Sequence, residues 1–161
     1  MSIFNIYAEL GEGIYLDKSS KKICWVDILN NMLFVATSLK VNSYRISKQV
    51  TTVLFLDNNL VYLTSSDGIA IFNTSTQSLH LTDKIPDFFS SKNYRSNDAI
   101  MISHGIYIYG VMDKNSETAG GIVVSKNNQS SVVDDNIFIP NTFINIPGTN
   151  DLLISDSIRY K

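Results

Sequence analysis

The sequence has a single cysteine, three prolines and no apolar run long enough to cross a membrane. Cys24 therefore cannot form an internal disulfide, and its apolar neighbours Ile23, Trp25 and Val26 predict a packed, unreactive thiol. A bilayer span needs about 20 consecutive apolar residues. The first residues also lack a basic stretch followed by a hydrophobic signal core. We therefore expect no membrane partner and a cytoplasmic protein.

Charge and recognisable catalytic motifs are scarce as well. Charged residues make up 17% of the chain, the net charge is -2, and Lys and Arg are scattered, which argues against nucleic acid as a partner. There is no Gly-x-Ser-x-Gly elbow, no glycine-rich phosphate loop, no His-Glu-x-x-His and no cysteine pair for zinc. The two histidines, His80 and His104, stand alone, and each is expected at a strand end or turn.

The sequence is rich in short runs of Ile, Val, Tyr and Phe, separated by clusters of Asn, Asp, Ser and Gly. Such runs predict β-strands, and no clear helical periodicity is present. With 161 residues, 44% of them hydrophobic, the chain can bury a core as one domain. The predicted strands are Gly13–Asp17, Lys22–Asp27, about Met32–Thr37, Thr51–Leu56, Leu60–Ser65, Gly68–Asn73, Ser78–Thr82, Ala99–Ser103, Gly105–Met112, Gly120–Ser125, Ser130–Asp134, Phe138–Asn145 and Asp151–Asp156.

These strands fall into repeated groups, with a looser segment, Asp83–Asn97, before the third group. Equivalent strands recur about every 40 residues, which is the period of four-stranded β-propeller blades. A β-sandwich is compatible with the strand spacing alone, but the repeated grouping in fours favours blades. We therefore predict an all-β, propeller-like fold in which residues 1–161 form a single partial domain of about three four-stranded blades.

Three residues with side-chain oxygens stand near the starts of repeat units: Glu12, Asn97 and Asn141. Equivalent positions of successive blades surround the propeller axis, so these oxygens could converge on one cation. Oxygen ligands suit calcium best, and zinc or manganese could compete if waters complete the shell. The alternative is that both asparagines serve turn backbones and that Glu12, between two glycines, is a solvated loop residue.

Several short segments, in order along the chain, resemble the regucalcin, gluconolactonase and senescence marker protein family. The first pair resembles the family's Gly-Glu segment and its Val-Asp-Ile strand end, and the later segments resemble its Arg-x-Asn-Asp, Gly-Thr-Met, Pro-Asn-Gly and Asp-Ser sequences. The matching segments are Leu10-Gly11-Glu12-Gly13, Trp25-Val26-Asp27-Ile28, Arg95-Ser96-Asn97-Asp98, Gly110-Val111-Met112, Ile139-Pro140-Asn141 and Leu153-Ile154-Ser155-Asp156-Ser157.

The resemblance implies half of a six-bladed propeller with one divalent cation on its axis, and many family members hydrolyse sugar lactones. It implies that Glu12 and Asn141 are metal ligands, that Asn97 lies beside the metal or the substrate, and that Arg95 contacts a polar or anionic substrate. In the family's chemistry, the cation polarises the lactone carbonyl while a carboxylate takes a proton from the attacking water.

The chain also departs from the family pattern. Ala99 and Thr142 stand where the family has glycine, so we expect the backbone near the pocket to differ. The family's remaining ligand, an aspartate that also serves as the proposed base, lies on a later blade and has no counterpart in this sequence. Asp156 corresponds to another family position, and Asp98 is expected to be a structural partner of its loop. No catalytic residue is therefore assigned.

Three hypotheses follow. The first is a degenerate gluconolactonase-like protein that binds a divalent cation and a sugar or sugar acid, with weak or no lactone hydrolysis. The second is an active metal-dependent lactonase, formed as a dimer. The third is a structural module that completes a propeller by homodimerisation, because half a propeller exposes sheet edges and an apolar face.

Overall fold

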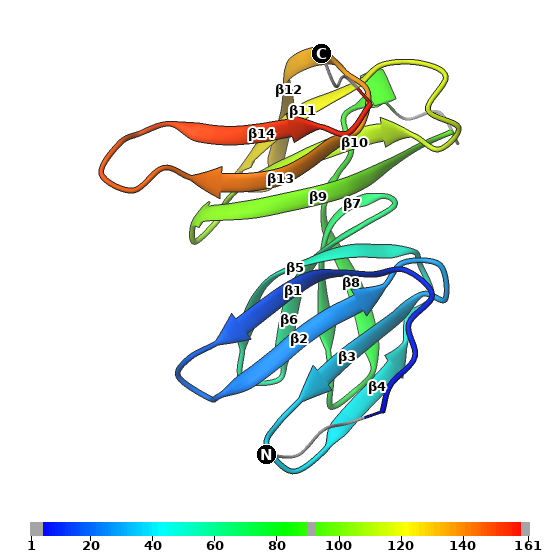
Figure 1. Ribbon diagram of the computed structural model, residues 1–161, viewed down its shortest axis with the longest axis vertical. Coiled ribbons are helices and arrows are strands. Elements are labelled where there is room, and N and C mark those ends of the chain that lie inside the picture. The colour runs from blue at the N-terminus through cyan, green and yellow to red at the C-terminus, as the bar shows by residue number, and fades with distance from the viewer. Residues whose placement is uncertain (1–4, 90–92, 159–161) are drawn as a thin grey trace.

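The computed structural model describes residues 5–89 and 93–158, and these residues form three four-stranded antiparallel sheets and one two-stranded sheet (Figure 1). The first sheet contains β1 (Gly11–Asp17), β2 (Lys22–Asp27), β3 (Met32–Ala36) and β4 (Val41–Arg45). The second contains β5 (Val50–Asp57), β6 (Leu60–Ser65), β7 (Gly68–Asn73) and β8 (Ser78–Lys84). The third contains β9 (Tyr94–Ser103), β10 (Ile106–Asp113), β11 (Gly120–Lys126) and β12 (Gln129–Ile137). The last sheet is the hairpin of β13 (Pro140–Asn145) and β14 (Leu152–Asp156), and a 3-10 helix, Asp87–Phe89, precedes β9.

Within each sheet the strands pair in the order of the chain, so each sheet is a simple meander. Short turns join the strands, and several turn residues have positive φ, including Asn31 at 54° and Asn58 at 53°. Asparagine tolerates this left-handed conformation better than most residues. Repeated four-stranded meanders are the building units of β-propellers, and the all-β, propeller-like prediction is confirmed.

The predicted strands were incomplete in two places. Val41–Arg45 forms β4, which was not predicted from the sequence because this outer strand is short and mostly polar. The segment Asp83–Asn97 was predicted to be loose, yet β9 begins at Tyr94. Arg95, Asn97 and Asp98, near the start of β9, line a cavity, so this part of the strand lacks the apolar signal on which strand prediction depends.

The hydrophobic core lies between consecutive sheets, in two clusters. Cys24, Val26 and Leu33 of the first sheet pack with Val53 and Leu63 of the second. In the other cluster, Leu54 and Ile69 of the second sheet pack with Tyr109, Val111 and Val123 of the third. Each fully buried aliphatic side chain contributes roughly 1.5–3 kcal/mol, so face-to-face packing of neighbouring sheets is the main source of stability.

One backbone hydrogen bond recurs at the same end of every sheet. The residue that follows the second strand donates its N–H to the carbonyl of the residue that precedes the first strand. The four bonds are Ile28 to Leu10 at 3.0 Å, Ser66 to Gln49 at 2.8 Å, Lys114 to Asn93 at 2.7 Å and Ser157 to Ile139 at 3.1 Å. The hairpin β13–β14 therefore corresponds to the first two strands of each four-stranded sheet and is a fourth copy of that part of the structural unit.

Two aspartates reinforce this closure in the first and last sheets. Asp27 accepts the backbone N–H groups of Glu9 and Leu10, at 3.0 and 3.1 Å. Asp156 accepts those of Phe138 and Ile139 at the same two distances. Asp156 thus plays the part in the fourth unit that Asp27 plays in the first, and both aspartates hold the chain that leads into an inner strand.

Candidate functional site

A cavity of about 230 Å³ opens at the end of the sheets where these closures lie. All four predicted site residues line it: Glu12 of β1, Arg95 and Asn97 of β9, and Asn141 of β13. The remaining lining residues are Leu10, Ile28, Thr51, Thr52, Asp98, Met112, Ile139 and Ser157. The sequence therefore identified residues that are far apart along the chain but that the fold brings to one place.

Strand register shows which of these residues are equivalent. Glu12 pairs with Val26, the residue before Asp27. Asn141 pairs with Ser155, the residue before Asp156. In the third sheet the equivalent position is that of Arg95, which pairs with Met112, the residue before Asp113. Asn97 lies two residues further along β9, where the register with β10 shifts.

The predicted equivalence thus holds for Glu12 and Asn141 and is wrong for Asn97. The irregularity in β9 is a bulge, which adds residues on one strand and re-aims their side chains. Asn97 does not occupy the repeated position: it lies two residues after Arg95, on the same side of β9, because side chains alternate along a strand.

The backbone after Glu12 and the backbone after Asn141 adopt the same unusual conformation. Gly13 has φ of 59° and Thr142 has φ of 58°. Thr142 therefore has the same left-handed backbone conformation as Gly13, its equivalent in the first sheet. A β-branched residue is strained in that conformation, since its Cβ crowds the following carbonyl.

Arg95 and Glu12 carry the opposite charges of the cavity. Arg95 Nη1 donates to the Ser96 carbonyl at 2.8 Å and to Asn97 Oδ1 at 2.9 Å. Burial lowers the pKa of Arg95, and the charge of Glu12 opposes that effect. Burial and the negative charge of Asp98 raise the pKa of Glu12, while Arg95 acts in the other direction.

Asp98 joins three strands, as expected of a structural partner of its loop. Its Oδ1 accepts the Ala99 N–H at 2.8 Å and the Thr52 hydroxyl of β5 at 3.2 Å. Its Oδ2 accepts the Thr142 N–H of β13 at 2.9 Å. Both carboxylate oxygens are therefore already engaged by protein donors.

Beneath the cavity lies a row of buried hydroxyl groups that no sequence pattern predicted. Ser96 Oγ donates to the Ser65 carbonyl at 2.6 Å, and Thr51 Oγ1 lies 2.8 Å from both Ser96 Oγ and Thr64 Oγ1. Each hydroxyl has one proton, and that of Ser96 is used on the carbonyl. Thr51 must therefore donate to Ser96 and Thr64 to Thr51, which gives the row one direction.

The described residues do not by themselves complete a divalent-cation site. No group of three or more His, Cys, Asp or Glu side chains is placed to hold a metal in the described part of the chain. Asn97 Oδ1 accepts from Arg95, and Asn141 Oδ1 accepts the Thr142 N–H at 3.0 Å. Calcium takes six to eight oxygens, and of the carboxylates and amides that line this cavity, those of Asp98, Asn97 and Asn141 already accept hydrogen bonds from the protein.

The two histidines lie outside the cavity. His80 is in β8, and His104 is in the β9–β10 turn, where its ring packs against Tyr62 at a centroid distance of 6.3 Å. Both side chains are exposed. The described residues include no helix of the length and apolarity that membrane crossing requires.

Repeated four-stranded meanders around a polar cavity define a propeller-type protein whose site lies where the sheet ends meet. Residues 10–161 match the family model described as the SMP-30/gluconolactonase/LRE-like region. The chain therefore belongs to this family, as its short motifs suggested.

Several solved structures share this fold. Regucalcin from Agrobacterium tumefaciens, a calcium-binding protein, is 23% identical with a TM-score of 0.84, over 94% of this chain and 52% of that one. A luciferin-regenerating enzyme is 18% identical with a TM-score of 0.74, over 84% and 48%. A gluconolactonase from Xanthomonas campestris is 12% identical with a TM-score of 0.72, over 93% and 55%. The chain spans about half the length of these structures, and at these identities they show the fold alone. Among curated proteins, no sequence matches significantly.

Proposed function

We propose that the cavity binds a small polyhydroxylated carboxylate, such as a sugar acid or the lactone derived from it, with weak or no lactone hydrolysis. The observation that carries this proposal is the placement of the Arg95 guanidinium and the Glu12 carboxylate in one cavity of about 230 Å³. That volume lies slightly below the usual range of small-molecule pockets, which suits a sugar-sized ligand.

The lining supports a ligand with both a charge and hydroxyl groups. A guanidinium carries five donors in a planar fork, and Nη1 of Arg95 uses its donors within the protein, which leaves the rest of the fork for a ligand carboxylate. Glu12 and Asn141 offer acceptors and donors for hydroxyl groups. Met112 and Ile28 provide an apolar wall for the carbon face of a sugar.

Weak catalysis is proposed because few groups in the cavity could act as a base. Both oxygens of Asp98 are held by protein donors. Glu12 remains the candidate, and its raised pKa makes it a stronger base than an ordinary carboxylate. A divalent cation has a secondary place in this proposal: calcium, or zinc or manganese, would bind weakly through Glu12 and Asn141 unless a ligand or further chain supplied more oxygens.

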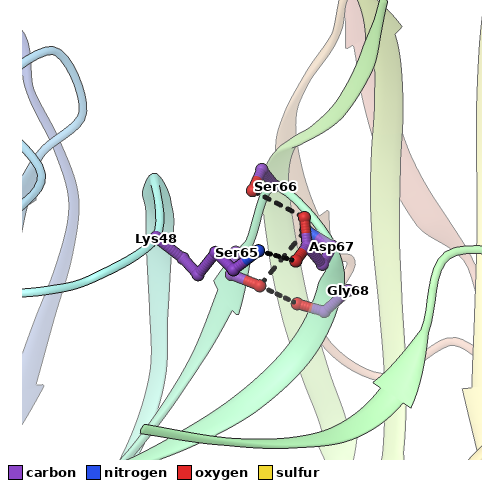
Figure 2. Close-up of polar contacts among 5 residues, drawn as sticks. All are labelled: Lys48, Ser65, Ser66, Asp67 and Gly68. Atoms are coloured by element: carbon purple, nitrogen blue, oxygen red, sulfur yellow. Dashed lines mark hydrogen bonds and ion pairs between the residues drawn. The ribbon is translucent and has the colours of Figure 1, made fainter. Parts of the chain in front are cut away.

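Calorimetric titration with D-gluconate tests the binding proposal. Wild-type protein should show saturable binding, and Arg95→Gln should weaken it at least tenfold, because a charge-assisted hydrogen bond is lost. Lys48→Gln is a matched control, because Lys48 does not line the cavity. Its Nζ forms an ion pair with Asp67 Oδ2 at 2.9 Å (Figure 2). Absence of saturable binding by wild-type protein refutes the proposal.

Lactone hydrolysis is tested separately, with glucono-1,5-lactone as the substrate. If the cavity retains activity, Glu12→Gln should abolish it, because an amide cannot accept the proton. A calcium titration in the same preparation, followed by chelation, shows whether any activity needs the cation. A turnover rate unchanged by Glu12→Gln would exclude Glu12 as the base.

A second candidate, assembly with another copy, is favoured by uncovered apolar faces. Ile14 and Leu16 of β1 are 76% and 53% exposed, and they point away from the second sheet because side chains alternate along a strand. In the last hairpin, Ile144 and Leu153 are paired neighbours, 49% and 56% exposed. A homodimer would bring together six four-stranded sheets and two hairpins and could cover both faces. A monomeric mass in sedimentation equilibrium would exclude this candidate.

A further inference from the structure

Two residues of the β9 bulge form hydrogen bonds with the backbone of β13, one on each side of Asn141. On one side, Asn97 Nδ2 donates to the Pro140 carbonyl at 3.0 Å. On the other, the Thr142 N–H donates to Asp98 Oδ2 at 2.9 Å. Figure 1 shows β9 running beside β13, so two consecutive residues of one sheet hold the start of the next.

The second of these contacts falls on a strained residue. Thr142 is exposed and has φ of 58°, a conformation that a β-branched side chain disfavours. Its equivalent in the first sheet is Gly13, which meets no such penalty. A charge-assisted hydrogen bond from the Thr142 N–H to Asp98 stabilises the turn here.

The Thr142 N–H is shared between two acceptors. It lies 2.9 Å from Asp98 Oδ2 and 3.0 Å from Asn141 Oδ1. Without the Asp98 carboxylate, the strained turn at Thr142 would lose its hydrogen bond to β9 and relax toward an unstrained backbone conformation. The side chain of Asn141, whose Oδ1 lies 3.0 Å from the Thr142 nitrogen, would then lose its present orientation in the cavity.

We propose that Asp98 is a positioning residue, whose carboxylate holds the Thr142 turn and thereby sets the orientation of the Asn141 side chain in the cavity. This role fits the geometry better than that of a base, because both Asp98 oxygens already accept hydrogen bonds from the protein. Its consequence for ligand binding rests on the proposed function, whereas its consequence for Asn141 does not.

The test is Asp98→Asn, read by NMR in the protein without ligand. The new amide cannot present an acceptor to Ala99 and Thr142 at once, so hydrogen exchange at the Thr142 amide should become at least tenfold faster. The side-chain amide resonances of Asn141 should shift. Asp67→Asn is the matched control, because Asp67 is also a partly exposed aspartate at a turn, bonded to Ser66 and Lys48 (Figure 2). This substitution should leave both readouts unchanged.

A second substitution distinguishes positioning from a general loss of structure. Glycine adopts positive φ without strain, so Thr142→Gly added to Asp98→Asn should return the Asn141 resonances close to those of the wild type. If Asp98→Asn alone does not fold, the double variant should fold and show that recovery. Unchanged Asn141 resonances in Asp98→Asn, or a double variant that shows no recovery, overturns the proposal.

The same variants are then titrated with D-gluconate. Asp98→Asn should weaken binding about tenfold, and the added Thr142→Gly should restore affinity to within about threefold. If wild-type protein binds no gluconate, the proposed function fails, and the positioning role is still decided by the Thr142 and Asn141 resonances. Equal gluconate affinity in wild type and Asp98→Asn, with binding established in the wild type, overturns the role of Asp98 in the cavity.

Discussion

The row of buried hydroxyls beneath the cavity predicts that two similar truncations have unequal costs. Thr64 donates to Thr51, Thr51 to Ser96, and Ser96 to the Ser65 carbonyl. Ser96 and Thr64 are both 0% exposed, so bulk solvent does not reach their hydroxyl groups. The position of each residue along the row therefore decides how many groups its removal leaves unsatisfied.

Ser96→Ala removes an acceptor and a donor at once. The Thr51 hydroxyl loses its acceptor and the Ser65 carbonyl loses a donor, and each buried unsatisfied group costs about 1–3 kcal/mol. We expect Ser96→Ala to lower the free energy of unfolding by about 2–4 kcal/mol. Thr64→Val removes only the donor at the start of the row, so its expected cost is about 1 kcal/mol.

Urea denaturation of the three proteins measures this difference. Ser131→Ala, on an exposed position of β12, is the control and should stay within about 0.5 kcal/mol of wild type. A Thr64→Val cost equal to or greater than that of Ser96→Ala would contradict the direction assigned to the row. A Ser96→Ala cost within the range of the control would show that the hydroxyls are not coupled at all.

Three further predictions concern single residues. Thr142→Gly should stabilise the protein by about 0.5–1 kcal/mol in urea denaturation, because relief of left-handed strain exceeds the entropy cost of glycine. Burial opposes ionisation of Asp27, but its hydrogen bonds lower its pKa below the value of an unfolded chain, about 4. The ionised side chain therefore stabilises the fold above about pH 4, and this contribution is lost as the pH falls through the folded pKa. The melting temperature of Asp27→Asn should therefore fall less steeply at acid pH than that of the wild type. Burial raises the pKa of Cys24 to about 11, so a thiol reagent at pH 8 should label it only in denaturant, and rapid labelling of native protein would contradict its burial.

The sequence was sufficient to predict the sheets because their core strands carry a strong apolar signal. Runs such as β6 and β7 are bounded by turn residues and rich in Ile, Val, Leu and Phe, so their limits were predicted correctly. The polar edge strand β4 and the start of β9 lack that signal. Neither could be identified from hydrophobicity, since one faces solvent and the other faces the cavity.

The cavity residues were predicted partly from spacing and partly from family motifs. Spacing correctly related Glu12 to Asn141, because both precede a residue with positive φ in equivalent strands. It misplaced Asn97, because the repeated position of β9 belongs to Arg95, whose side chain has no oxygen and was therefore not among the residues compared. The engagement of Asp98 with Thr142 depends on how the sheets pack, which strand spacing does not contain.

The repeated closure of the sheets explains how one structural unit can build an asymmetric cavity. The closing hydrogen bond joins backbone atoms in all four units, so it does not constrain the side chain at the neighbouring position of the inner strand. That position holds Glu12 in the first unit, Arg95 in the third and Asn141 in the fourth. Because the backbone fixes where these side chains start, their polar groups meet in one cavity, and the chemistry of the site can vary without any change in the fold.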